Sequence, residues 1–250
     1  MKGVFLQQQL EFRLEVSGTE WSQGEPVPCI LSIINHGAVT QSVNDLYLRL
    51  VLGDNKSLKN QVVGAFQPVA AAELAAAVAV DPQKQQSFPW TFQLEKDCVI
   101  TDKSQGFYLL YGAGTAWESL GRLPLPILPH RHIQAVLRIL ETTFKFVVKG
   151  CKSAKGWVEV KLKPPAGKKF AALEQLLLYA RCDGDDLFLK YVFRVQEFSA
   201  SSSALVMQKG KKEVEQRHNS GQYLFPGGQI NREPLQQALE EALKQVGSAF

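Results

Sequence analysis

The chain has 250 residues, a length that suits one large domain or two domains of ordinary size. Hydrophobic residues make up 45% and charged residues 21% of it, which is typical of globular proteins and excludes the disordered and collagen-like classes. Residues 1–128 carry 9 basic and 12 acidic side chains, whereas residues 129–250 carry 19 and 12. The basic second half therefore favours an acidic partner or surface.

No segment is expected to span a membrane. The longest run of small apolar residues, 69–80, is mostly alanine, contains Glu73, and is shorter than the roughly 20 residues that a bilayer requires. The first twelve residues contain too few apolar positions for a signal peptide. The four cysteines lie far apart without a CxxC pair, which favours reduced thiols. We therefore expect a cytoplasmic protein.

Period-two alternation dominates the first half of the chain. Leu10, Phe12, Leu14 and Val16 alternate with charged residues, which predicts a half-buried strand. Similar short strands are expected at 46–52 and 88–94, bounded by turn residues and without an intervening helical period. This pattern predicts an antiparallel β-sandwich. The alanine-rich segment 69–80 is interpreted as a loop that leads into a strand.

The hydrophobic period changes after the proline-rich segment 123–132. Ile133, Val136, Leu137 and Leu140 recur at helical spacing and predict one short helix. The prolines and the change in charge predict that segment 123–132 is the joint between two domains, 1–128 and 129–250.

Strands resume after this helix. Residues 173–195 predict a hairpin with its turn at Asp183–Asp186, which we prefer to a calcium site because Leu187 and Phe188 follow directly. A C-terminal helix is expected between Asn231 and Gly247, with an apolar face that is formed by Leu235, Leu239, Ala242, Leu243 and Val246. The predicted fold class is mainly β, with two tandem β-sandwich domains, a short helix at the start of the second domain and a C-terminal helix.

His130 and His132 form the most conspicuous candidate for a metal site. Residues two apart on a helix face different sides, so both could bind one ion only if this segment were extended. No HExxH motif or sequence cluster of cysteine and histidine supports a metal site. We therefore interpret the pair as part of the joint, and we expect no catalytic, cofactor-binding or metal-binding residues.

A group of lysines near one tryptophan is the candidate partner site: Lys149, Lys152, Lys155, Trp157, Lys161 and Lys163. Alternation places Trp157, Lys161 and Lys163 on one face of a strand. An acidic protein is the expected partner, because a nucleic-acid site would need more interleaved aromatic residues and a recognisable motif. The alternative is that these lysines only keep a sheet edge soluble.

Four segments follow one another in an order that resembles the bacterial sporulation-control protein family, which belongs with the arrestin-like folds. They are "GTEWSQGEPVPCILSI", "FPWTFQL", "LPHRHIQAVLRILETTFKF" and the hairpin region that begins at "GWVEVKLKPPAGKKF". The resemblance includes the Gly24–Glu25 turn and the step from Pro129 to His130 before a helix. It implies two arrestin-like β-sandwich domains and a regulatory or adaptor protein without catalysis, acting in a stress, sporulation-like or trafficking-like process.

Two other functional classes remain open. A metal-dependent or other hydrolytic enzyme would need His36, His130, His132 or His218 to converge with the acids of Asp183–Asp186. A carbohydrate-binding β-sandwich would need Trp21, Trp117 or Trp157 to be exposed along one groove.

Overall fold

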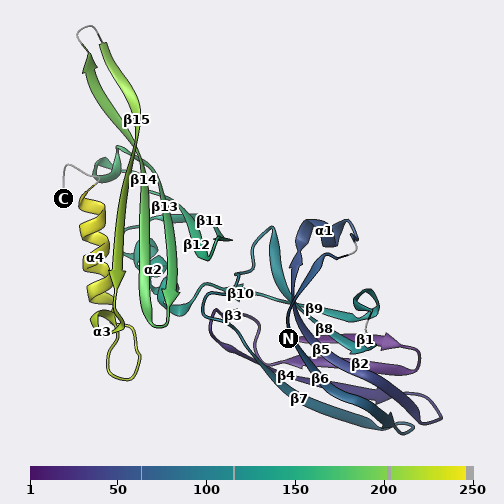
Figure 1. The fold of residues 1–250 in the computed structure, drawn as a ribbon. Helices are drawn as coiled ribbons and strands as arrows, with labels where there is room; N and C mark the ends of the chain where they lie inside the picture. Colours follow the sequence, from purple (N-terminus) through teal and green to yellow (C-terminus); the bar gives the residue numbers. More distant parts are fainter. Residues whose placement is uncertain (63, 115, 202–203, 246–250) are drawn as a thin grey trace. The chain divides into compact units, whose positions relative to one another are not determined.

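A computed structural model describes residues 1–62, 64–114, 116–201 and 204–245. The chain forms two compact units, residues 1–128 and 129–250, and both are built mainly of antiparallel strands (Figure 1). No helix in the described part of the chain is long and apolar enough to cross a membrane.

Unit 1 is a sandwich of two four-stranded antiparallel sheets. The first sheet has the order β1 (Lys2–Gln7), β2 (Leu10–Val16), β4 (Pro26–Asn35), β7 (Gln85–Gln93). The second has the order β6 (Phe66–Val80), β5 (Gln41–Asp54), β8 (Gln105–Ala113), β9 (Gly121–Leu125). Smaller elements are α1 (Asn55–Lys59), the 3-10 turn at Trp117–Ser119, and a parallel pair formed by β3 (Trp21–Ser22) and β10 (Ile127–Leu128).

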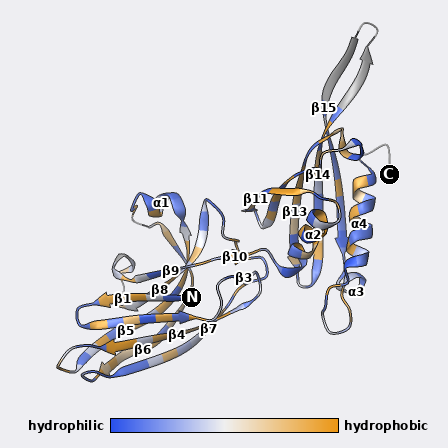
Figure 2. Ribbon diagram, turned by 180° about the vertical axis from the view of Figure 1, so that it is seen from behind, coloured by the Kyte–Doolittle hydropathy of each residue, from blue (hydrophilic) through white to orange (hydrophobic). Residues whose placement is uncertain are grey.

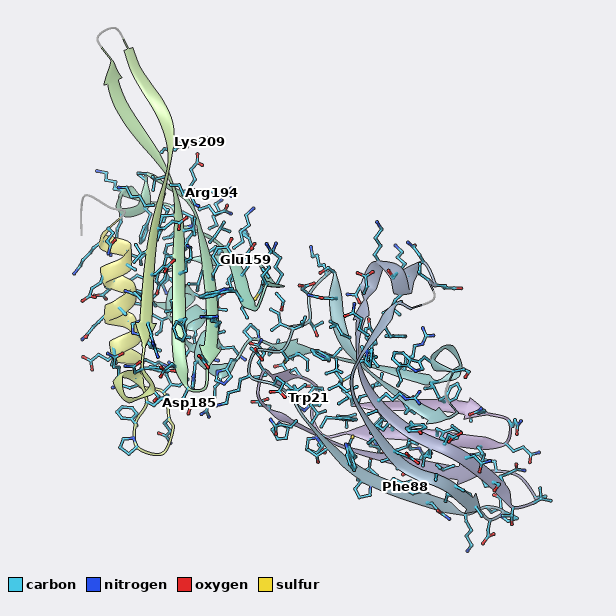
Figure 3. The ribbon with its side chains drawn as sticks, in the orientation of Figure 1. Trp21, Phe88, Glu159, Asp185, Arg194 and Lys209 are labelled. Atoms are coloured by element: carbon cyan, nitrogen blue, oxygen red, sulfur yellow. The ribbon has the colours of Figure 1, made fainter. Side chains whose placement is uncertain are left out.

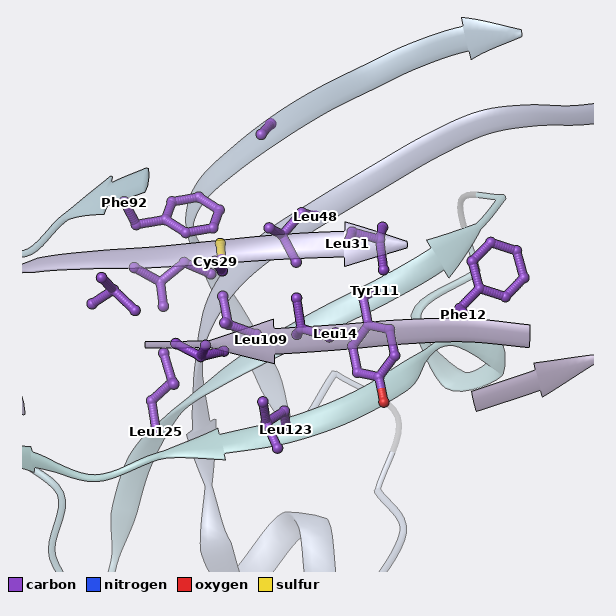
Figure 4. Close-up of a cluster of buried hydrophobic side chains, with 14 of the residues drawn as sticks. Phe12, Leu14, Cys29, Leu31, Leu48, Phe92, Leu109, Tyr111, Leu123 and Leu125 are labelled. Atoms are coloured by element: carbon purple, nitrogen blue, oxygen red, sulfur yellow. The ribbon is translucent and has the colours of Figure 1, made fainter. Parts of the chain in front are cut away.

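The core of unit 1 lies between its two sheets (Figure 4). The four apolar residues of β2 are buried and the charged residues between them are half-buried, as the alternation predicts. They meet the inward side chains of the opposite sheet, including Leu48, Leu109 and Tyr111. The sandwich therefore follows from one apolar face per strand.

The alanine-rich segment is strand throughout, so the prediction of a loop at its start was wrong. It lies within β6, which pairs with β5 from Gly53↔Phe66 to Gln41↔Val80. Two register shifts accommodate this long pairing. Pairing with β5 satisfies the backbone groups on the inner side of this edge strand, and this tertiary contact overrides the helix propensity of alanine.

Unit 2 contains one five-stranded antiparallel sheet whose strands follow the chain order. They are β11 (Val147–Ala154), β12 (Trp157–Lys163), β13 (Leu173–Asp183), β14 (Asp186–Ser201) and β15 (Ala204–His218). The helical elements are α2 (Arg131–Thr142), the 3-10 turn at Lys168–Phe170, α3 (Ser220–Tyr223) and α4 (Arg232–Lys244). The predicted mainly β class, with a short helix that opens the second unit and a C-terminal helix, is confirmed.

The helices cover one face of the sheet of unit 2. Helix α2 contacts β13 and α4, and the side-chain amide of Gln216 on β15 donates a 2.9 Å hydrogen bond to the Ala238 carbonyl of α4. Hydrophobic and hydrophilic residues alternate around α4 (Figure 2), and its buried residues include the predicted Leu235, Leu239, Ala242 and Leu243. Val246 and Gly247, which the sequence also assigned to this helix, lie outside the described residues.

The turn between β13 and β14 is a two-residue hairpin connection. Asp183 pairs with Asp186, and Gly184 has φ +60° at the first central position. Glycine adopts this conformation without steric cost, which explains its place in the turn. The predicted hairpin at Asp183–Asp186 is confirmed.

Replacing a core leucine of unit 1 with alanine tests the packing of the sandwich. Leu14 is fully buried in β2, whereas Leu6 in β1 is 65% exposed. We expect Leu14→Ala to lower the free energy of unfolding by about 2–5 kcal/mol, because it leaves a cavity. The matched Leu6→Ala change should stay within about 0.5 kcal/mol. Urea unfolding of the full chain measures both, and equal effects would contradict this core assignment.

The start of α4 depends on Asn231, whose side-chain oxygen accepts a 3.2 Å hydrogen bond from the Glu233 amide. We expect Asn231→Ala to lower the free energy of unfolding by about 1 kcal/mol, because this amide loses its partner. Asn231→Asp keeps the acceptor and should retain the stability. Thermal unfolding of the two variants provides the comparison; a loss in Asn231→Asp as large as in Asn231→Ala would rule out the cap.

Candidate functional site

The candidate site lies on the face of the unit 2 sheet opposite the helices, here called the outer face. On β12, Val158, Val160 and Leu162 are buried, whereas Lys161 and Lys163 are exposed. Trp157 and Glu159 are half-buried on the same side as these lysines. The alternation predicted from the sequence therefore describes β12 correctly.

Strand pairing extends this face across the sheet. Lys161 pairs with Leu177, Leu177 with Val192, and Val192 with Glu213, so these four residues form one row from β12 to β15. The next row contains Tyr179 and Lys190. Directly opposed residues of antiparallel strands share a face. Apolar and charged side chains are thus interleaved on the outer face.

A shallow hollow of about 730 Å³ lies over these rows. Its apolar floor is formed by Leu177, Tyr179 and Val192. Its charged and remaining lining residues are Glu174, Lys190, Arg194, Lys209, Gly210, Lys211 and Glu213. Glu159, Arg194 and Lys209 mark this sheet in Figure 3. The hollow is an apolar surface with a rim of mixed but mainly positive charge.

Ion pairs order one side of the hollow. The Lys190 ammonium lies 2.8 Å from Glu213 and 2.9 Å from Glu215, and Lys211 also pairs with Glu213. Hydrogen bonds from Lys190 and then Lys211 lower the pKa of Glu213 to about 2. The same contacts, first with Glu213 and then with Glu215, raise the pKa of Lys190. The two acids neutralise part of the basic rim around Lys190 and Lys211.

Cations and aromatic rings alternate across the end of the outer face nearest the β13–β14 turn. The Arg181 guanidinium lies 4.7 Å from the Trp157 ring centroid and 5.0 Å from that of Phe188. Arg217 lies 5.0 Å from the Phe188 centroid and 2.9 Å from the Asp186 carboxylate. This series of cations and rings, here called the cation–aromatic ladder, takes one side chain from each of four strands. It places a cation beside the ring of Trp157.

The predicted lysines divide into two groups. Lys161 and Lys163 lie on the outer face, and Lys161 is directly opposite Leu177 of the hollow. Lys149 and Lys152 belong to β11, where Lys152 lies 3.2 Å from Glu159. Lys155 occupies the β11–β12 turn with φ +51°. None of the six predicted residues lines the hollow itself, and Lys161 comes nearest to it through its pairing with Leu177.

The sequence analysis missed the hollow itself. Leu177 and Tyr179 occupy half-buried positions of β13 that alternate with fully buried ones, whereas Val192 of β14 is itself buried. This alternation is visible in the sequence of the predicted hairpin. It could have identified Leu177, Tyr179 and Arg194 as residues of the same face as Lys161.

A second candidate is a buried cluster of His130, His132 and Cys182, here called the HHC cluster. One potential ligand atom from each residue lies within 4.8 Å of the others, and Sγ of Cys182 is 3.3 Å from Nδ1 of His130. His130 caps α2 with extended backbone angles of φ −52° and ψ 144°, so it is not on the helix. The helical-face argument against convergence of the two histidines therefore does not apply, and Cys182 was missed.

Within the described residues, the structure does not bring together the full sets of side chains that the hydrolase and the carbohydrate-binding alternatives require. The HHC cluster is the one three-residue group of potential metal ligands within the described residues, and it includes neither His36, His218 nor the acids of the β13–β14 turn. His36 instead contacts Glu11 in unit 1 at 2.9 Å. Trp21 is buried, so it does not meet the exposure that a carbohydrate groove would require of it. Of the residues that the hydrolase alternative names, only His130 and His132 come together in the HHC cluster.

Comparisons with known proteins identify a fold. No protein-family model and no curated protein matches the sequence. The chain is similar to the crystal structure of Spo0M, a sporulation control protein from Bacillus subtilis, with a TM-score of 0.61, 15% identity, and coverage of 95% of this chain and 98% of that chain. An alkylpurine DNA glycosylase, AlkC, from Pseudomonas fluorescens gives a TM-score of 0.30 at 14% identity over 48% of this chain and 30% of that chain. The last similarity is too weak to carry an argument; the chain has a Spo0M-like fold.

Proposed function

We propose that this chain is a non-catalytic regulatory or adaptor protein of the cytoplasm that binds an acidic protein through the outer face of unit 2. The observation that carries the proposal is the hollow with an apolar floor and a mainly basic rim. The partner surface would include the predicted residues: Lys149, Lys152, Lys155, Trp157, Lys161 and Lys163. The Spo0M-like fold supports the regulatory class, because that similar protein is described as a sporulation control protein.

The two parts of the hollow suit different aspects of protein recognition. The half-buried Leu177 and Tyr179 offer apolar area that a partner side chain can remove from water. The exposed Lys161, Lys163 and Arg194 lie around this floor and would speed the approach of an acidic surface. A protein surface combines both features.

A nucleic acid fits the outer face less well. Single-stranded nucleic acids commonly stack bases on accessible aromatic rings. Here Arg181 occupies the space beside Trp157 and Phe188, and Arg217 lies over Phe188 as well. The aromatic rings of the ladder are therefore engaged by the protein's own cations, which favours a protein partner.

Cross-linking from the floor of the hollow can identify the partner. A photoreactive residue at Leu177 should capture a protein that mass spectrometry identifies, whereas the same residue at exposed Leu6 on β1 serves as the control. We expect capture from Leu177 only. Capture of the same protein from both positions would contradict a site on the outer face.

Charge reversal then tests the basic rim. We expect Lys161→Glu combined with Lys163→Glu to weaken binding of the cross-linked partner by about tenfold, or about 1.4 kcal/mol, without lowering the melting temperature. Raising the salt concentration should weaken the wild-type complex more than the variant complex, because salt screens the lost attraction. Titration calorimetry measures both effects. Lys56→Glu with Lys59→Glu on α1 is the matched control, and unchanged affinity in the Lys161 and Lys163 variant would refute the proposal.

A further inference from the structure

The HHC cluster brings three side chains that commonly bind transition metals into the interior of unit 2. His130 is 5%, His132 0% and Cys182 6% exposed. His130 and His132 lie at the start of α2, and Cys182 is the next-to-last residue of β13. Polar side chains are rarely buried together without hydrogen bonds or a functional role, so this cluster calls for an explanation.

The spacing of the donor atoms suits a zinc ion. Zinc binds cysteine sulfur at about 2.3 Å and histidine nitrogen at about 2.0–2.1 Å in tetrahedral geometry, which places neighbouring ligand atoms about 3.3–3.6 Å apart. The Cys182 Sγ and His130 Nδ1 atoms are already 3.3 Å apart, and every donor of the cluster lies within 4.8 Å of the others. These separations are close to those that a shared zinc ion requires.

We propose that His130, His132 and Cys182 bind one zinc ion. Binding replaces the thiol proton: Zn²⁺ and the Cys182 thiol give a zinc–thiolate bond and one released proton, while both histidines remain neutral donors. The three residues leave one tetrahedral position for a water molecule. This inference replaces the sequence-based expectation of no metal and does not depend on the proposed partner site.

Neighbouring groups are placed to orient the ligands. The Tyr223 hydroxyl of α3 lies 2.9 Å from Nδ1 of His132 and donates a hydrogen bond to the Asp185 carbonyl. Because that hydroxyl proton goes to the carbonyl, its oxygen can accept the Nδ1–H of His132, which leaves Nε2 as the metal-binding nitrogen. Such a partner is typical of metal-bound histidine.

One existing contact must give way to the metal. The His132 backbone N–H lies 3.3 Å from Nδ1 of His130, where it forms the cap of α2. This distance is at the long end for a hydrogen bond, so the contact is weak. A metal on His130 therefore replaces a weak cap with a bond that connects the start of α2 to the end of β13.

We expect the bound ion to stabilise the folded chain. A buried site contributes its binding free energy to folding, because the unfolded chain does not hold the three donors together. The ion would join the helical layer of unit 2 to its sheet beside the β13–β14 hairpin. Metal removal should therefore loosen this end of unit 2 without changing the outer face directly.

Metal content of the full-length wild-type chain is the first test. Untagged protein is incubated with zinc under reducing conditions and then desalted. We expect elemental mass spectrometry to find about one equivalent of retained zinc. Cys182→Ser should retain less than about a tenth of that amount, since the thiolate is the charged ligand. The matched controls Cys151→Ser and His36→Ala, which change residues outside the cluster, should retain one equivalent.

Three measurements on the wild-type chain keep the test decisive if Cys182→Ser fails to fold. Cobalt should produce a thiolate-to-cobalt charge-transfer band that zinc abolishes, and zinc should raise the melting temperature while a chelator lowers it. Zinc should also protect Cys182 from alkylation more than Cys151. Retention below a tenth of an equivalent by the wild type, or a cobalt spectrum without a thiolate band, would overturn the proposal.

Discussion

The sheet of unit 2 has two faces, and α2 and α4 remove one of them from water. Leu176, Leu178 and Leu189 are buried on this covered face, so the apolar side chains of the sheet depend on the helices. The outer face stays in contact with water, so its own side chains have to make that surface compatible with solvent. It does so with ion pairs around Glu213 and with the cation–aromatic ladder around Phe188. The hollow is the part of that face where Leu177, Tyr179 and Val192 form an apolar floor.

Local pattern was sufficient to predict the faces of most strands, because successive side chains of a strand point to opposite sides. β2 and β12 show this directly, with buried and accessible residues at the predicted positions. The pattern failed at the alanine-rich β6. Alanine lacks a side chain large enough to mark a face, and the strand is held by its pairing with β5, which lies earlier in the chain. The register of that pairing cannot be read from the segment itself.

The candidate sites depend on contacts that no local pattern contains. Cys182 lies 52 positions after His130, and the two meet only because α2 packs near the end of β13. The position at which α2 begins also decides the geometry. A helix that began one residue earlier would place His130 within regular helical backbone, where it and His132 would face different sides. The sequence indicated the helix near this position but not the approach of Cys182 to His130.

The two units differ in how far apart along the chain their paired strands lie. In unit 2 each strand of the sheet pairs with the next one in sequence, from β11 to β15. In unit 1, β4 pairs with β7 and β5 with β8. The chain between the paired strands must therefore form a closed loop before these strands can meet. Domains dominated by local contacts generally fold faster than those that need distant ones. We therefore expect the sheet of unit 2 to form on a shorter timescale than the sandwich of unit 1, and the outer face would be complete while unit 1 is still acquiring its distant strand pairs.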